Sequence, residues 1–290
     1  MKDQKKLIVF TVDEKYFPHF FTALRSFVET NDVSQYLIGL IYSGINEGSI
    51  SELFDYFHQY DLEISAQEVR DKFTEVNVAY HFNHIIFYRL LAPELFGNYE
   101  RMLYLDCDII FVGDVSEIFD SDLNDRVLGA IDKTPFFGVP EHLLGLIDRY
   151  LASGLLLINT KNFIANNVRD KCIDFLNTHH YEMPDQDALS YVVQDFLPID
   201  PSYSVETAFM DRTESLFDFV KKTKIIQFSG SSKPWQMNNN HPYKKMYWKY
   251  RNKTPYKSYF PDDMSFSAVI RKITPCKFKK NVKKIIGKTL

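Results

Sequence analysis

The chain has 290 residues, 45% of them hydrophobic, which allows one large domain or one domain with a small appendage. Three scattered cysteines, Cys107, Cys172 and Cys276, fit neither a disulfide framework nor a zinc site, and so favour a reducing compartment. The apolar run at residues 7–12 is too short for a signal peptide. No run approaches the length of a membrane-spanning helix.

The net charge of −4 is unevenly distributed. Residues 271–290 hold eight basic and no acidic residues, whereas the rest of the chain has 26 basic and 38 acidic residues. Apolar residues recur at helical spacing within this basic segment, for example Phe278, Val282, Ile285 and Ile286. We therefore expect a domain at residues 1–264 and a basic amphipathic tail at residues 265–290.

The first half of the chain alternates between strand and helix patterns. Buried strands are expected at residues 7–12, 36–42 and 62–64. Helical spacing follows the first strand at Phe20, Leu24, Phe27 and Val28, and the second strand at Leu53, Phe54 and Phe57. Such alternation predicts an α/β fold with a mostly parallel sheet.

The second half continues the alternation less regularly. A helix at residues 83–91 is expected to end before Pro93. Helices are also expected at residues 163–176 and 188–193. Further strands are expected at residues 101–105, 109–112, 127–131, 154–158 and 224–227.

Two carboxylates, Asp106 and Asp108, follow the apolar strand at residues 101–105. Carboxylates at the edge of a core are costly unless a positive charge lies beside them. Oxygen donors at this spacing suit Mg²⁺ or Mn²⁺, and Cys107 between them is expected to point into the core. A surface turn with solvated acids is the alternative.

The first strand ends in Asp13, and Thr11, Asp13 and Tyr16 are the candidate nucleotide-binding residues of this segment. A polar residue between a first strand and a helix is a common nucleotide-binding position. Asp13 is equally suited to cap the following helix. Because no glycine-rich phosphate loop follows, a nucleotide would be held through its base and a metal ion.

Three later segments have the composition of ligand-binding loops or helix starts. Ser153 and Gly154 either let a ligand approach the backbone or form a strand-entry turn. Asp185, Gln186 and Asp187 open a helix, where the carboxylates either stabilise its start or face a sugar. The segment from Gly230 to Trp235, with Lys233, has the composition of an anion-binding loop.

Taken in order, these segments resemble glycosyltransferase family 8, and within it the bacterial lipooligosaccharide α-galactosyltransferases and α-glucosyltransferases. The resemblance covers about residues 7–240. It is carried by Asp13, Tyr88-Arg89-Leu90, Leu103-Tyr104-Leu105-Asp106-Cys107-Asp108, Ser153-Gly154-Leu155-Leu156-Leu157-Ile158-Asn159, Asp185-Gln186-Asp187 and Gly230-x-x-Lys233-Pro234-Trp235.

The resemblance implies a GT-A fold, with a Rossmann-like mixed sheet flanked by helices, that transfers a hexose from a UDP-sugar with retention of anomeric configuration. It implies Mn²⁺, or Mg²⁺, between Asp106, Asp108 and the diphosphate. It further implies uracil contact by Asp13 and donor contact by Arg89. Asp185 would bind sugar hydroxyls, Gln186 would lie beneath the anomeric carbon, and Gly230 and Lys233 would hold the diphosphate.

Two positions depart from the family pattern. Gln227 stands where the family usually has a histidine as third metal ligand, which suggests looser metal binding; His241 is a possible substitute. Ala152 stands where the family often has an asparagine that contacts the donor, so the sugar specificity is left open.

The leading hypothesis is a metal-dependent retaining hexosyltransferase that extends a cell-surface glycan. The alternatives are a nucleotidyltransferase and a nucleotide-sugar-binding protein with weak or no catalysis. The basic tail predicts peripheral attachment to the inner face of the cytoplasmic membrane. The acidic remainder argues against nucleic-acid binding.

Overall fold

The protein is described from a computed structural model, which describes residues 5–70, 72–73, 76, 83–207, 222–258, 261 and 263–264. Its larger sheet contains, in spatial order, β3 (Glu63–Glu68), β2 (Tyr36–Ser43), β1 (Lys6–Asp13), β4 (Arg101–Leu105), β7 (Leu151–Asn159), β6 (Leu128–Asp132) and β8 (Leu197–Pro198). A smaller sheet contains β5 (Ile109–Phe111), β10 (Ile225–Gln227) and β9 (Val205–Glu206).

The larger sheet is mixed. Strands β3, β2, β1 and β4 run parallel, whereas β7 pairs antiparallel with both β4 and β6. The carboxyl ends of β1 and β4 therefore open at one edge, where Asp13 and Asp106 follow them. Ligands of open α/β sheets bind at this edge.

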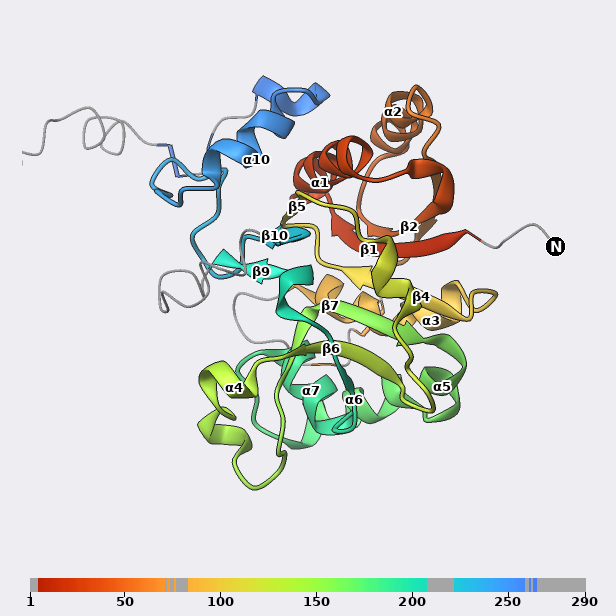
Figure 1. Cartoon of the computed structure of the whole chain (residues 1–290), viewed down its shortest axis with the longest axis vertical. Helices are drawn as coiled ribbons and strands as arrows, with labels where there is room; N and C mark the ends of the chain where they lie inside the picture. Colours follow the sequence, from red (N-terminus) through yellow and green to blue (C-terminus); the bar gives the residue numbers. More distant parts are fainter. Residues whose placement is uncertain are drawn as a thin grey trace, which may run out of the picture.

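Helices cover both faces of the larger sheet. In Figure 1, α1 (Phe17–Thr30), α2 (Glu47–His58) and α10 (Lys244–Arg251) lie on one side, and α5 (Thr160–Ala165), α6 (Val168–Thr178) and α7 (Pro184–Val192) on the other. Two short helices are α3 (Ala92–Leu95) and α4 (Thr134–Phe137). The 3₁₀ segments are η1 (Val33–Gln35), η2 (His84–Leu91), η3 (Ser116–Asp120), η4 (Glu141–Leu143), η5 (Pro201–Tyr203) and η7 (Pro255–Ser258).

The two faces of the sheet bury separate apolar clusters. Successive residues of a strand point to opposite faces. In β1, Phe10 therefore joins the cluster beneath α1 and α2, and Val9 joins the cluster beneath α5, α6 and α7. In β4, Leu105 and Tyr104 divide in the same way. Since both faces are covered, β1 and β4 read as continuous apolar runs.

Two of the helix predictions made from the sequence differ in detail from the structure. Pro93 does not end a helical region: η2 ends at Leu91, and Pro93 lies in the first turn of α3, where no N–H is needed. The expected helix at residues 163–176 is two helices, α5 and α6. Asn167 between them has a left-handed backbone with φ of 51°.

Cys107 and Cys172 are buried free thiols, and Cys107 joins the core as expected. Cys276 and the basic amphipathic tail at residues 265–290 lie outside the described residues. In the part of the chain that the structure describes, no helix combines the length and apolar character needed to cross a membrane.

An aromatic junction joins α1, α10 and the segment after β10. His19 of α1 stacks on Trp235, with ring centroids 3.5 Å apart, and its Nδ1 lies 2.6 Å from the hydroxyl of Tyr247 in α10. Burial, together with the nearby cations Arg251 and Lys233, lowers the pKa of His19 well below its usual value. His19 is therefore neutral in the folded protein near neutral pH.

This neutral histidine predicts a loss of stability in acid. Below about pH 6.5 an unfolded histidine binds a proton that folded His19 does not. The free energy of unfolding should therefore fall by up to about 1.4 kcal/mol for each unit of pH below 6.5 through this residue. Urea unfolding of the protein and of a His19→Phe variant at pH 7.5 and 5.5 measures the difference.

The variant is expected to be less stable at pH 7.5, because the Tyr247 hydroxyl loses its hydrogen bond with His19 and keeps the longer one from Arg251. It is also expected to lose less stability on acidification than the parent. An equal loss in both proteins would contradict the prediction.

Candidate active site

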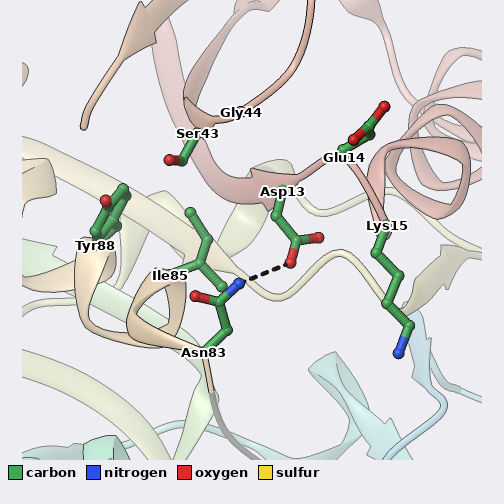
Figure 2. A pocket seen from close by; sticks show the side chains of 8 residues that line it. All are labelled: Asp13, Glu14, Lys15, Ser43, Gly44, Asn83, Ile85 and Tyr88. Carbon is green, nitrogen blue, oxygen red and sulfur yellow. Dashed lines mark hydrogen bonds between the residues drawn. The ribbon is translucent and has the colours of Figure 1, made fainter. Parts of the chain in front are cut away.

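A cavity of about 380 Å³ opens at the carboxyl ends of β1 and β2. Figure 2 shows its lining side chains, which are Asp13, Glu14, Lys15, Ser43, Gly44, Asn83, Ile85 and Tyr88. Its polar and apolar walls and its volume are typical of small-molecule sites.

Asp13 both orders the backbone and faces this cavity. Its Oδ1 accepts a hydrogen bond from the backbone N–H of Tyr16 at 2.9 Å, in the turn before α1. Its Oδ2 accepts from the Asn83 amide at 3.2 Å, the contact drawn in Figure 2. Asp13 is therefore not the helix cap considered for it, because the N-cap of α1 is Tyr16; its side chain instead orders the turn before the helix and lines the cavity.

Asp106 lies at the end of β4, where donors surround its carboxylate. Oδ1 accepts from Arg89 at 3.0 Å and from the hydroxyl of Tyr104 at 3.3 Å, and Oδ2 accepts from the Gln227 amide at 2.9 Å. Burial, with Asp108 and Asp185 nearby, raises the pKa of Asp106 to about 6, although Arg89 opposes the shift.

Asp108 lies two residues further on and contacts a cation of the chain. Its Oδ2 is 2.5 Å from the Lys233 ammonium, which also donates to the Phe228 carbonyl at 2.7 Å. Its Oδ1 is buried and has no hydrogen-bond partner. A buried carboxylate oxygen without a partner is costly, and is found where another ligand is expected.

Arg89 joins the Asp106 carboxylate to α7. Its guanidinium is 2.9 Å from Asp185, donates to the Ser153 carbonyl at 2.7 Å, and lies over the ring of Tyr104. Burial disfavours its charge, but Asp185, Tyr104 and Asp106 together hold the pKa of Arg89 above its usual value. Arg89 thus stays charged at 5% exposure.

Gln227, at the end of β10, reaches the Asp106 carboxylate from the smaller sheet. Its side chain packs on Gly154, where a Cβ atom would lie 2.3 Å from the amide. Glycine is therefore required at 154 to admit Gln227, and Ser153 and Gly154 lie within β7 rather than in a turn.

The start of α7 carries the three residues expected to face a sugar, and the structure separates their environments. Asp185 pairs with Arg89, and the Gln186 carbonyl oxygen accepts from the Ser153 backbone N–H at 3.3 Å. Asp187 is fully buried and accepts from Tyr150 at 2.6 Å and His142 at 2.8 Å. It also accepts from the backbone N–H groups of residues 182 and 183.

The loop after β10 presents Lys233 to Asp108. Gly230 has φ of 78°, a left-handed conformation that favours glycine. Trp235 anchors the loop on His19, and the Pro234 carbonyl accepts from Trp248 of α10 at 3.0 Å. The α1–α10 junction therefore holds this loop against the strand ends.

Thr11 and His241 were also considered as site residues. The Thr11 hydroxyl is buried and lies 2.9 Å from that of Tyr104, so it is engaged within the protein. Within the described ranges, no three His, Cys, Asp or Glu side chains come together as a metal site, so His241 does not join Asp106 and Asp108.

Sequence reasoning missed Tyr104, Tyr150 and His142. The position of Tyr104 two residues before Asp106 places both on one face of β4, a signal present in the sequence. Tyr150 and His142 of η4 lie 37 and 45 residues from Asp187 in the sequence, and no local pattern marks them.

Comparisons with known proteins identify the family of the chain. The family model for "Glycosyl transferase family 8" matches residues 7–239. General stress protein A of Bacillus subtilis (strain 168) is 26% identical over 87% of this chain and 95% of its own length. Lipopolysaccharide 1,2-glucosyltransferase of Escherichia coli (strain K12) is 24% identical over 88% of this chain and 80% of its own length.

Solved structures match the fold. The galactosyltransferase LgtC, solved with donor and acceptor sugar analogs, superimposes with a TM-score of 0.74 at 19% identity over 89% of this chain and 98% of its own. Glycosyltransferase GlyE of Streptococcus pneumoniae TIGR4 gives a TM-score of 0.69 at 22% identity, covering 97% of this chain and 64% of its own. The chain therefore belongs to glycosyl transferase family 8 and is a glycosyltransferase with a GT-A-like fold.

Proposed function

We propose that this protein is a metal-dependent retaining hexosyltransferase that uses UDP-glucose or UDP-galactose to extend a cell-surface glycan by an α-linked sugar. The observation that carries the proposal is the Arg89 guanidinium, which contacts Asp106 at 3.0 Å and Asp185 at 2.9 Å. One buried cation thereby connects a carboxylate suited to a metal–diphosphate with a carboxylate suited to a sugar.

The residues around Asp106 and Asp108 fit a hard divalent cation. The donor set consists of oxygens, which suit Mn²⁺ or Mg²⁺, and the unpartnered Oδ1 of Asp108 supplies a buried acceptor that lacks a hydrogen bond. Rotation of the Gln227 amide would turn its oxygen toward the same point, since amide orientation follows from hydrogen bonding. The cation would supply Lewis-acid stabilisation of the departing diphosphate.

The neighbouring cavity suits the nucleoside of a UDP-sugar. Asp13 and Asn83 offer hydrogen-bonding groups for a base, and Tyr88 and Ile85 offer apolar walls. Lys233, at the Gly230 loop, is placed to neutralise the diphosphate as its charge develops. Asp185 and Gln186 then lie on the sugar side, linked to Asp106 through Arg89.

The side chains at the start of α7 support attack by the acceptor on the same face of the sugar as the leaving group. A double displacement needs a carboxylate nucleophile, with the catalytic pair about 5 Å apart. Asp185 is paired with Arg89, and Asp187 is enclosed by Tyr150, His142 and backbone donors. Gln186 is a weak nucleophile. The acceptor hydroxyl therefore attacks from the leaving-group side, and a diphosphate oxygen takes its proton.

Asp187 serves as a positioning residue in this scheme, because it ties the start of α7 to Tyr150 and η4. The proposed acceptor class is supported by the similarity to relatives such as the E. coli lipopolysaccharide 1,2-glucosyltransferase. Attachment to the inner membrane face through the basic tail remains part of the proposal, and its residues lie outside the described part.

Asp106→Asn tests the metal site with almost no change in shape. Loss of the charge should lower metal-dependent UDP release from the preferred UDP-sugar by at least about a hundredfold. The assay is a panel of UDP-sugars with Mn²⁺ present or chelated. Asp195→Asn, which removes an exposed carboxylate that pairs with Arg126, is the control and should keep parental turnover. Parental turnover of Asp106→Asn in chelator would refute the proposal.

Gln227→His tests the third ligand. An imidazole is a stronger ligand than a neutral amide, so Mn²⁺ affinity should rise on the order of tenfold. Titration of free Mn²⁺, followed by electron paramagnetic resonance, measures the affinity directly. Unchanged or weaker binding by a variant of parental melting temperature would exclude residue 227 from the metal site.

A further inference from the structure

The hydroxyl of Tyr104 makes two polar contacts at the site, although the side chain is buried among apolar residues. Its side chain is 1% exposed, yet its hydroxyl lies 3.3 Å from Asp106 Oδ1 and 2.9 Å from the hydroxyl of Thr11. A buried tyrosine hydroxyl needs a partner, but one partner would suffice. Here two polar groups from different strands converge on it.

The sheet brings these three side chains together. Val9 of β1 lies opposite Tyr104 of β4, so continuing this parallel register places Thr11 level with Asp106. Residues two apart share a face of a strand, so Thr11, Tyr104 and Asp106 all face the same side. The side chains of Leu103 and Leu105 join the opposite cluster.

The directions of the hydrogen bonds among Thr11, Tyr104 and Asp106 follow from the acceptor, Asp106. An ionised carboxylate only accepts, so the single proton of Tyr104 points to Asp106. The Tyr104 oxygen must then accept from Thr11.

The consequence is a fixed orientation of the Asp106 carboxylate. Arg89 and Tyr104 both hold Oδ1, and the Asp106 backbone N–H donates to the Gly154 carbonyl at 3.0 Å. Oδ2 is thereby turned toward Gln227, and the next residue, Phe228, donates its backbone N–H to the Asp108 carbonyl at 2.8 Å. Hydrogen bonds of this kind orient carboxylate ligands and tune their affinity for a cation.

We propose that Thr11 and Tyr104 form a relay that positions the Asp106 carboxylate for a divalent cation, so that both are positioning residues of the metal site. This inference rests on the proposed metal dependence. It assigns Thr11 to the support of Asp106 instead of to the nucleotide. The relay acts before any donor binds, because its contacts lie wholly within the protein.

The experiment measures Mn²⁺ binding to the full chain by calorimetry and by electron paramagnetic resonance, without donor. Tyr104→Phe deletes one hydroxyl and keeps the ring beneath Arg89. It should weaken Mn²⁺ binding about tenfold and lower the melting temperature by ~2–4 °C, since Thr11 loses its partner. The double variant Thr11→Val/Tyr104→Phe removes both partners and should recover the melting temperature but not the affinity.

Tyr36→Phe is the matched control, because Tyr36 is fully buried in β2 and pairs in register with Lys6, at the opposite end of the strands from Asp13. Its Mn²⁺ affinity should equal that of the parent. Parental affinity in the double variant, or in Tyr104→Phe, would overturn the relay.

Asp106→Asn distinguishes failure of the proposed metal site from failure of the relay formed by Thr11 and Tyr104. Loss of Mn²⁺ binding in Asp106→Asn, with parental binding in the double variant, would overturn the relay alone. Parental Mn²⁺ binding in Asp106→Asn would overturn the metal site and the relay with it.

Discussion

The site depends on one buried cation, Arg89. Its guanidinium touches Asp106 and Asp185 and also donates to the Ser153 carbonyl. An isolated charge at this depth would be strongly disfavoured, and either carboxylate without it would be repelled by the other. The arginine therefore permits two acidic side chains to face a common space. The same contacts set the relative position of η2, β4, β7 and α7 around the site.

The mixed sheet makes this arrangement possible. Parallel pairing of β1 and β4 delivers Asp13 and Asp106 to one edge, whereas the antiparallel β7 brings Ser153 and Gly154 back beside them. The smaller sheet then places Gln227 on Gly154, and the loop after it places Lys233 on Asp108. Each strand supplies only one or two polar groups, so the core on both faces remains apolar.

Much of the site was predictable because its residues stand at strand ends and helix starts. Asp106, Asp108 and Asp13 are marked by buried strands that stop at carboxylates, and Asp185 and Gln186 by the first turn of a helix. The break between α5 and α6 was missed, because it depends on a left-handed Asn167 that apolar spacing does not show. The environment of Asp187 was missed as well, because its partners His142 and Tyr150 are distant from it in the sequence.

The sequence alone determined the alternation of strands and helices, the order of the motifs and the acidic pair at Asp106 and Asp108. These properties are local, since they follow from side-chain periodicity and from the cost of charge beside apolar runs. Only the tertiary structure decided which donors each carboxylate oxygen receives: Arg89 and Tyr104 on one oxygen of Asp106, Gln227 on the other, and Lys233 on Asp108. Such contacts join residues up to 125 positions apart. They are set by strand register and packing, which no local sequence pattern specifies.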